Sequence, residues 1–258
     1  MTRIIAVVNQ KGGVAKTTSC INIGAGLARL GKKVLLIDLD PQANLTYSLG
    51  IQGHESNTTI VELLDDKCTI QETLIKVSNY YVIPSKLDLA NLERKINSKA
   101  TGRELVLKKK LQDIINIFDY ILIDCPPSAS ILVYNALAFA NEVFIPVQCE
   151  YLSLHGLVKI TSMIEEVKED LNNNIKISGI IATMFQGISG LNKEVLQTLQ
   201  DNYSSLLFKT PIRRTVSLAD AQAENRDIFL SNINSNGSLD YWALCKEIVE
   251  QERKMTNE

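Results

Sequence analysis

Short apolar runs of strand length recur along the chain, separated by stretches in which apolar residues follow helical spacing. The runs are rich in Ile, Val and Leu and do not alternate with polar residues, which is typical of strands covered on both faces. They cover residues 3–9, 34–38, 81–84, 120–124, 142–147 and 177–183.

The stretches between these runs predict amphipathic helices. They cover residues 16–30, 103–116, 130–140, 155–171, 191–202 and 238–254. Strands that alternate with helices predict an α/β fold with one doubly wound, mostly parallel sheet and helices on both faces. Because no repeat, low-complexity tract or linker-like segment interrupts the pattern, we expect a single domain over residues 1–258.

The composition narrows the class of protein further. A chain of 258 residues, 45% of them hydrophobic, can bury a large core without disulfides or metal ions. The five cysteines are widely spread and there are two histidines, which argues against a disulfide framework or a zinc site. No apolar run approaches the roughly 18 residues of a membrane span, and the first residues lead straight into a strand. We therefore expect a cytoplasmic protein.

A loop with two glycines joins the first predicted strand to the first predicted helix and reads QKGGVAKTT over residues 10–18. Such a loop points backbone N–H groups and the positive end of the helix dipole at one place, which suits a polyphosphate. Lys16 would reach the β and γ phosphates and the Thr17 hydroxyl would bind Mg²⁺. Gln10 and Ala15 occupy both glycine positions of the generic G-x-x-x-x-G-K-[ST] pattern.

The methyl group of Ala15 restricts positive φ, so we expect the loop to adopt a conformation that an L-residue tolerates there. Nucleotide binding should survive, with an altered affinity or rate.

Three motifs together resemble the ParA/Soj family of DNA-partition ATPases, which have a deviant Walker A motif. They are K-G-G-x-x-K-T-T from residue 11, DLDPQAN over residues 38–44 and ILIDCPPS over residues 121–128. Each motif alone could serve only a turn or a helix cap. All three follow successive strands, whose carboxyl ends converge on one crevice in a doubly wound sheet. The resemblance identifies a P-loop NTPase with Walker A and Walker B elements.

The resemblance implies ATP as substrate, Mg²⁺ as cofactor and a role for each motif residue. Thr17 and Asp124 would hold the metal, with Asp38 as a more distant contributor or a switch-loop residue. Asp40 lies two residues beyond Asp38, where it could orient or activate the attacking water. Catalysis is assigned to Lys11, Lys16 and Asp40. The phosphates would be bound by Lys11, Gly12, Gly13, Val14, Ala15, Lys16, Thr17 and Thr18.

In the family, the additional lysine, here Lys11, crosses a dimer interface and contacts the phosphates held by the opposite subunit. ATP would then be sandwiched in a homodimer that hydrolysis destabilises. The adenine contacts are expected from Met184 at a strand end and from Pro211, Arg213 and Thr215 in a later loop. Met184 and Phe185 could equally be core residues.

Members of the family bind DNA without sequence preference as ATP-bound dimers. Local basic clusters can supply phosphate contacts, so a net charge of −2 is no obstacle. We favour Lys209, Arg213 and Arg214, although Ser217 stands where the family often has a basic residue. A second cluster, which could also be the solvated face of a helix, comprises Arg94, Lys95, Lys99, Arg103, Lys108, Lys109 and Lys110.

The resemblance also implies a ParB-like partner protein that stimulates hydrolysis, and an association with the nucleoid. The chain starts at its first strand, so no N-terminal helix-turn-helix domain is expected. A MinD-like membrane ATPase is the main alternative, but the C-terminal segment is rich in Glu, and its Leu239, Trp242 and Ile248 favour packing against the core. A partition-type ATPase with a protein cargo and a nucleotide-binding scaffold without turnover are further alternatives.

Overall fold

The computed structural model describes residues 2–52, 58–150, 153–187 and 190–257. Its centre is a sheet in the order β3-β4-β2-β5-β1-β6-β7, in which β3 and β4 are antiparallel and all other neighbours are parallel. The strands are β1 Arg3–Val7, β2 Val34–Asp38, β3 Ile75–Val77, β4 Tyr80–Ile83, β5 Tyr120–Asp124, β6 Glu142–Gln148 and β7 Lys176–Thr183. The predicted doubly wound sheet is confirmed, and the short edge strand β3 is an addition to it.

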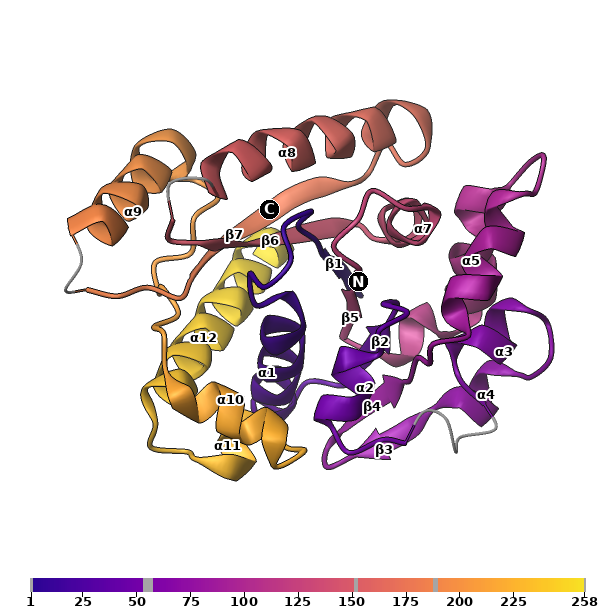
Figure 1. The fold of residues 1–258 in the computed structure, drawn as a ribbon, viewed down its shortest axis with the longest axis horizontal. Helices are drawn as coiled ribbons and strands as arrows, with labels where there is room; N and C mark the ends of the chain where they lie inside the picture. Colours follow the sequence, from indigo (N-terminus) through magenta and orange to yellow (C-terminus); the bar gives the residue numbers. More distant parts are fainter. Residues whose placement is uncertain (1, 53–57, 151–152, 188–189, 258) are drawn as a thin grey trace.

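Helices cover both faces of this sheet (Figure 1). The α-helices are α1 Lys16–Arg29, α2 Asn44–Ser48, α3 Ile60–Leu64, α4 Ile70–Thr73, α5 Leu89–Asn97, α6 Val106–Leu111, α7 Ile131–Phe139, α8 Ser153–Asp170, α9 Gly190–Tyr203, α10 Val216–Ala223, α11 Ile228–Ser231 and α12 Asn236–Asn257. Short 3₁₀ helices, η1 Arg103–Leu105 and η2 Gln112–Ile117, flank α6. Among the described residues, no helix has the length and apolar character needed to cross a membrane.

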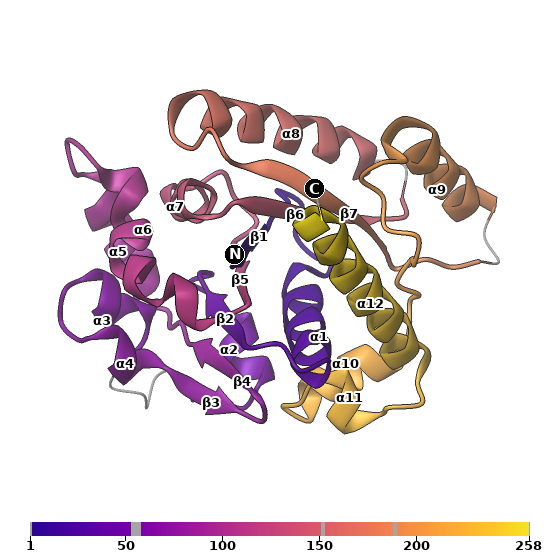
Figure 2. The ribbon, with the colours of Figure 1, turned by 180° about the vertical axis from the view of Figure 1, so that it is seen from behind.

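Two hydrophobic cores lie on opposite sides of the sheet. Along β1, Ile5 and Val7 belong to the core that also contains buried residues of α1 and α12. Ile4 and Ala6 belong to the core formed with α7 and α8. Seen from behind, α1 and α12 lie side by side across one face (Figure 2). Burial on both sides explains why the strands are apolar throughout rather than alternating.

The helix predicted over residues 103–116 is wrong in detail, because the structure breaks it into η1, α6 and η2. The break begins where a continuous helix would join the N–H of Leu107 to the carbonyl of Arg103. Both groups bond instead to the side chain of Asn135 on α7: its Oδ1 accepts from Leu107 N at 3.0 Å and its Nδ2 donates to Arg103 O at 2.7 Å. A tertiary contact therefore replaces the helical hydrogen bond.

Candidate nucleotide-binding site

The three motifs meet at one edge of the sheet. Asp124 at the end of β5 lies in register with Val7 on β1 and with Asp38 on β2. The loops that follow these three strands therefore start beside one another, as expected for parallel strands at a switch point. They line a pocket of about 370 Å³ whose walls include Gly12, Gly13, Ala15, Lys16, Thr17, Thr18, Asp40, Asn44, Pro127 and Gln222.

Neighbouring strands hold the phosphate loop in place. The side chain of Asn9 accepts from Lys11 N at 3.0 Å and donates to the carbonyl of Pro146 on β6 at 2.7 Å. Val14 is fully buried, and its carbonyl accepts a hydrogen bond of 3.1 Å from Thr183 Oγ1 at the end of β7. Gly13 has a φ of 73°, which glycine adopts without strain. The loop is thus ordered by contacts that involve no ligand.

Ala15 does not avoid the left-handed region, so the expectation of an ordinary conformation there is wrong. It precedes α1 with φ 67° and ψ 33°. Non-glycine residues visit this region at a cost, because the Cβ comes close to the following carbonyl oxygen. Ala43, immediately before α2, and Met184 are also left-handed, with φ values of 54° and 53°. Ala15 and Met184 line the phosphate pocket, so two of the described non-glycine residues with positive φ are at this site.

Lys16 is the buried cation of the pocket. Only 7% of the residue is exposed, and its Nζ donates to the carbonyl of Lys11 at 3.2 Å. Burial lowers the pKa of this ammonium, while the nearby carboxylates of Asp124 and Asp40 act in the opposite direction. An anion in the pocket would compensate for the hydration that burial has removed from the Lys16 ammonium.

The residues at the base of the pocket fit a magnesium ion. Thr17 Oγ1 donates to Asp124 Oδ2 at 2.7 Å, so the two predicted metal ligands are in contact. Asp124 is fully buried and its Oδ1 has no hydrogen-bond partner. Burial and the adjacent charge of Asp38 raise the pKa of Asp124 well above its usual range. An oxygen without a partner, on a buried carboxylate, suits a hard cation.

The described residues contain no cluster of three or more His, Cys, Asp or Glu side chains that could hold a metal. A Mg²⁺ ion at Thr17 and Asp124 would therefore take its remaining ligands from phosphates and water, as is usual for this ion.

Asp38 and Asp40 play different parts. Asp38 is fully buried, and its Oδ1 accepts from Asp40 N in the loop after β2, while its Oδ2 accepts from the N–H and the hydroxyl of Thr46 on α2. This arrangement fits the switch-loop role better than a direct metal contact. Asp40 lines the phosphate pocket, is 6% exposed, and accepts from Gln42 N at 2.9 Å. Asp40 therefore lies in the same pocket as the phosphate loop.

The side chain of Lys11 contacts three residues of its own chain in this structure. Its Nζ lies 3.2 Å from Gln148 Oε1, 3.1 Å from Glu150 Oε2 and 3.3 Å from Ser153 Oγ. The side chain is 37% exposed and that of Glu150 is 51% exposed, so the pair is solvated and worth about 1 kcal/mol or less. Such a contact can be exchanged for another partner at little cost. The role of Lys11 across a dimer stays a prediction.

A second pocket, of about 230 Å³, adjoins the phosphate pocket. Met184, Arg213 and Thr215 line it, as predicted for an adenine site, whereas Pro211 does not. Phe185 packs against the core and is not among its lining residues. Sequence reasoning missed Gln222 on α10, which lines both pockets and donates to Thr18 Oγ1 at 3.1 Å. No motif or periodicity marked this residue.

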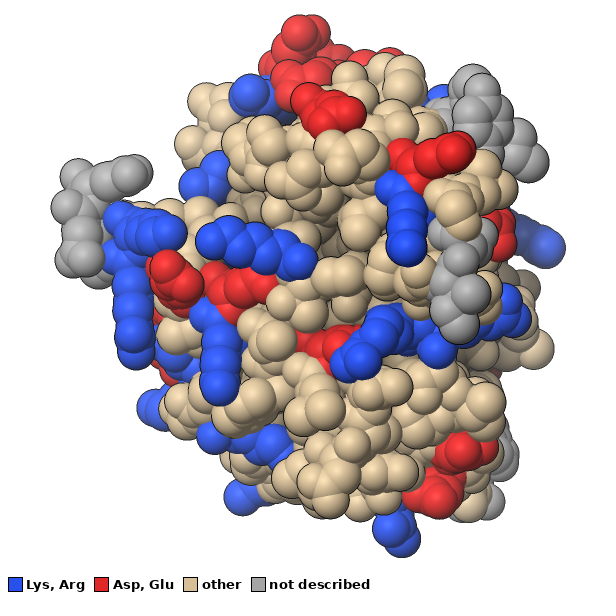
Figure 3. Space-filling view, turned by 90° about the vertical axis from the view of Figure 1, so that its left-hand side faces the viewer, with Lys and Arg blue, Asp and Glu red and all other residues tan. Residues whose placement is uncertain are grey.

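The favoured basic cluster is only partly available to a ligand. Arg213 makes three hydrogen bonds to the carboxylate of Asp240 through Nε and Nη2, the shortest of 2.6 Å. Arg214 and Lys209 are exposed. Figure 3 shows Lys and Arg in a band across this face, with Asp and Glu among them. The charge that this face presents is therefore smaller than the sequence suggests.

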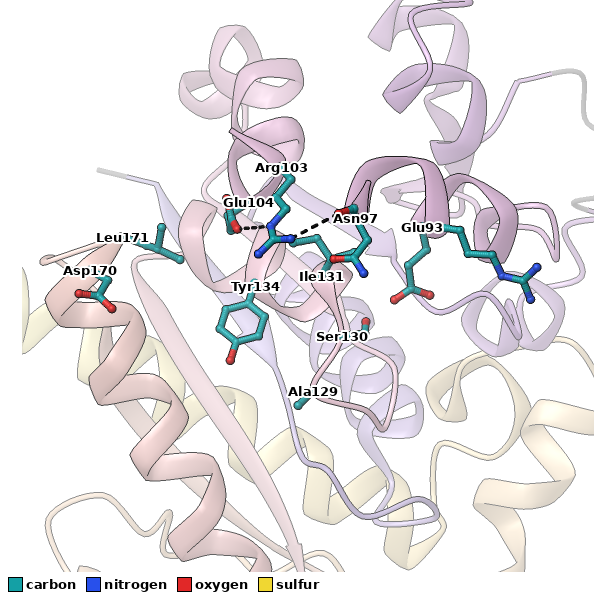
Figure 4. Close-up of a pocket in the computed structure, with 11 residues that line it drawn as sticks. Glu93, Asn97, Arg103, Glu104, Ala129, Ser130, Ile131, Tyr134, Asp170 and Leu171 are labelled. Atoms are coloured by element: carbon teal, nitrogen blue, oxygen red, sulfur yellow. Dashed lines mark hydrogen bonds and ion pairs between the residues drawn. The ribbon is translucent and has the colours of Figure 1, made fainter. Parts of the chain in front are cut away.

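The second basic cluster is also interrupted by acids. Lys95 pairs with Asp65 and Lys110 with Asp66. Arg103 pairs with Glu104 at the wall of a separate cavity of about 590 Å³, between α5, η1 and α7 (Figure 4). None of the residues predicted to bind the nucleotide lines this cavity.

Known proteins resemble this chain over most of its length. Residues 2–177 match a family model described as an AAA domain. The chain is 38% identical over 251 residues to the sporulation initiation inhibitor protein Soj of Bacillus subtilis, covering 96% of this chain and 99% of that protein. The chain belongs to the ParA/Soj family of partition ATPases. It is also 40% identical to the chromosome-partitioning ATPase Soj of Treponema pallidum, over 98% of this chain and 99% of the relative.

A solved structure supports the assignment of the ligands. The chain superposes with a TM-score of 0.86 and 33% identity on cobyrinic acid a,c-diamide synthase from Mycobacterium smegmatis with bound ADP and magnesium, covering 98% of this chain and 96% of that one. ATP as substrate and Mg²⁺ as cofactor, both predicted from the sequence, are thus confirmed for this ParA/Soj-family ATPase.

Proposed function

We propose that this ParA/Soj-family chain, as a single domain, dimerises around two Mg·ATP, binds DNA without sequence preference in that state and releases it after hydrolysis. Its role would be to move plasmid or chromosomal cargo over the nucleoid in the cytoplasm, with a ParB-like partner stimulating hydrolysis. The observation that carries the proposal is that Lys16, Thr17 and Asp40 line one pocket and that the buried Asp124 accepts a hydrogen bond from Thr17 there. The relatives named as chromosome-partitioning proteins support the cargo.

The pocket supplies what phosphoryl transfer to water requires. Loop amides and the buried Lys16 would bind the β and γ phosphates, and Thr17 and Asp124 would hold Mg²⁺. The metal, when bound, neutralises charge on the phosphate oxygens. Asp40 would orient the attacking water, so that the γ-phosphoryl group leaves as inorganic phosphate and ADP remains.

Dimerisation would use Lys11, which is only weakly held in the subunit. Its contacts with Gln148, Glu150 and Ser153 leave it 37% exposed. The charges of a triphosphate on a facing subunit offer a stronger partner than one solvated carboxylate. We therefore propose that Lys11 leaves these contacts when the ATP-bound dimer forms.

DNA binding would rest more on Arg214 and Lys209 than on Arg213, because Asp240 already neutralises Arg213. A matched pair of variants tests this division. Arg214→Ala is expected to weaken DNA retention and to lower its dependence on salt, whereas Arg213→Ala should change both less. Equal losses in the two variants would show that Arg213 leaves Asp240 to contact DNA. No loss in either would move the surface to residues 94–110.

Two assays test the function as a whole. Phosphate release from ATP, with water as the only acceptor, is expected from the wild type and should fall to a small residual rate in Asp40→Ala and Lys16→Ala. Release by the wild type also separates hydrolysis from the amide synthesis named for one structural neighbour, and its absence would favour a scaffold. DNA retention is expected with ATP but not with ADP. Retention by anionic vesicles instead of DNA would favour a MinD-like protein.

A further inference from the structure

A closed ring of hydrogen bonds begins and ends on the backbone of Asp40. Asp38 Oδ1 accepts from Asp40 N at 3.1 Å, and Asp38 Oδ2 accepts from Thr46 Oγ1 at 2.7 Å. Thr46 Oγ1 in turn accepts from Ser85 N at 2.8 Å. The ring closes through Ser85 Oγ, which donates to the carbonyl of Asp40 at 2.9 Å.

Every member of this ring is withdrawn from solvent. Asp38, Thr46 and Ser85 are fully buried, and Asp40 is 6% exposed. Water therefore cannot replace a lost partner easily. Loss of the Thr46 hydroxyl would leave the N–H of Ser85 without its partner, and loss of the Ser85 hydroxyl would leave the Asp40 carbonyl held by Ala43 N at 2.9 Å. Thr46 Oγ1 donates to a carboxylate and so can only accept from Ser85, which fixes the direction of the hydrogen bonds along this part of the ring.

The ring connects two strands of the sheet. Ile37 of β2 pairs with Ile83 of β4. Ser85, two residues after Ile83, therefore lies beside the start of the loop that joins β2 to α2 and contains Asp40. Thr46 lies on α2, at the far end of that loop. Hydrogen bonds thus connect the backbone of Asp40 to the end of β2, to α2 and to the segment that follows β4. Both the N–H and the carbonyl of Asp40 are held, which restricts the peptide plane on each side of its Cα.

We propose that Thr46 and Ser85 are positioning residues for hydrolysis: their hydroxyl groups fix the backbone of Asp40 so that its carboxylate faces the water that attacks the γ-phosphate. The inference rests on the proposed role of Asp40. Neither hydroxyl contacts the nucleotide pocket directly, because neither residue is among those that line it. Their loss should therefore reduce turnover without weakening nucleotide binding.

The test compares hydrolysis by the full-length chain with that of three variants. Ser85→Ala and Thr46→Val are expected to lower kcat about tenfold while KM and the affinity for a fluorescent ATP analogue change less than about twofold, since a small misplacement of a catalytic group is costly. Thr46→Ser keeps the hydroxyl and should restore most of the rate. If Thr46→Val does not fold, Ser85→Ala, which loses one oxygen atom, carries the comparison.

Thr73→Val is the matched control. Thr73 is equally buried, but its hydroxyl bonds only to the carbonyl of Ile70 within α4. Its substitution should lower the melting temperature without changing kcat. A similar fall in kcat for Thr73→Val and Ser85→Ala would show a general loss of stability and would overturn the inference.

A double variant distinguishes this inference from the proposed function. If Ser85 acts through Asp40, then adding Ser85→Ala to Asp40→Ala should produce no further loss of rate. Full hydrolysis by Asp40→Ala would refute the catalytic role of Asp40 and this inference together. Loss of hydrolysis in Asp40→Ala, with a wild-type kcat in Ser85→Ala and Thr46→Val, would overturn only the positioning role.

Discussion

Replacing Ala15 by glycine should stabilise the protein, although glycine usually destabilises a folded chain. Ala15 sits between the phosphate loop and α1 with φ 67° and ψ 33°. An L-residue in this left-handed region costs roughly 1–2 kcal/mol, and glycine removes that cost. Glycine also makes the unfolded chain more flexible, which opposes the gain by about 0.4–1 kcal/mol.

The difference leaves a net stabilisation of between about 0 and 1.6 kcal/mol, centred near 0.8 kcal/mol. In a chain of 258 residues, such a gain corresponds to a rise in melting temperature of about 1–3 °C. The measurement is thermal or urea unfolding without nucleotide or Mg²⁺, so that ligand binding does not contribute to the apparent stability.

Ala243→Gly is the control for this prediction. Ala243 lies within α12 and is half-buried, so glycine there should cost about 1 kcal/mol of helix stability. The two identical substitutions are thus expected to shift the melting temperature in opposite directions. A fall of similar size in both variants would refute the inferred strain at Ala15.

Three further predictions concern the fold and the ligands. Glu142→Ala leaves the buried Arg3 without its 2.5 Å partner, and should lower the free energy of unfolding, measured in urea, by about 3–5 kcal/mol. Burial raises the pKa of Asp227, so its contribution to stability should fall as the pH rises above about 4. In Asp227→Asn, the free energy of unfolding measured over a pH series should not show this fall. A dependence on pH equal to that of the wild type would contradict the prediction. Removing Mg²⁺ with a chelator should weaken ATP binding, measured with a fluorescent analogue, at least tenfold, because a buried Asp124 would lose its cation; an unchanged affinity would contradict the metal site.

The sheet and the phosphate loop could be predicted from the sequence because local signals determine them. The central strands are buried on both faces, so most of their side chains are apolar, whereas the partly buried edge strand β3 is not predicted by this pattern. The phosphate loop needs backbone amides at a helix N-terminus, which the glycines and the following helical pattern already indicate. The order of the strands then brings Asp38 and Asp124 into register.

Features that depend on distant partners could not be predicted in this way. The helix over residues 103–116 is broken by Asn135, which lies on a different helix. Arg213 was expected to be an available cation, but Asp240, far along the sequence, neutralises it. The sequence pattern also predicts a buried Leu239, whereas 54% of this residue is exposed, while Ile248 is buried as expected. The two residues are nine positions apart on α12, which is two and a half helical turns, so one face of the helix cannot bury both.

The pairing of the first strand with the last helix bears on how the protein is synthesised. Arg3 donates to the carbonyl of Ile248 at 2.9 Å, and Ser19, beside the phosphate loop, bonds to Tyr241 at 3.0 Å. A nascent chain that has produced the phosphate loop must therefore wait for α12 before α1 is covered. At about 5–20 residues per second, the interval between residues 19 and 241 is on the order of ten to forty seconds. During translation, the nucleotide pocket is among the first parts to be made and among the last to be completed.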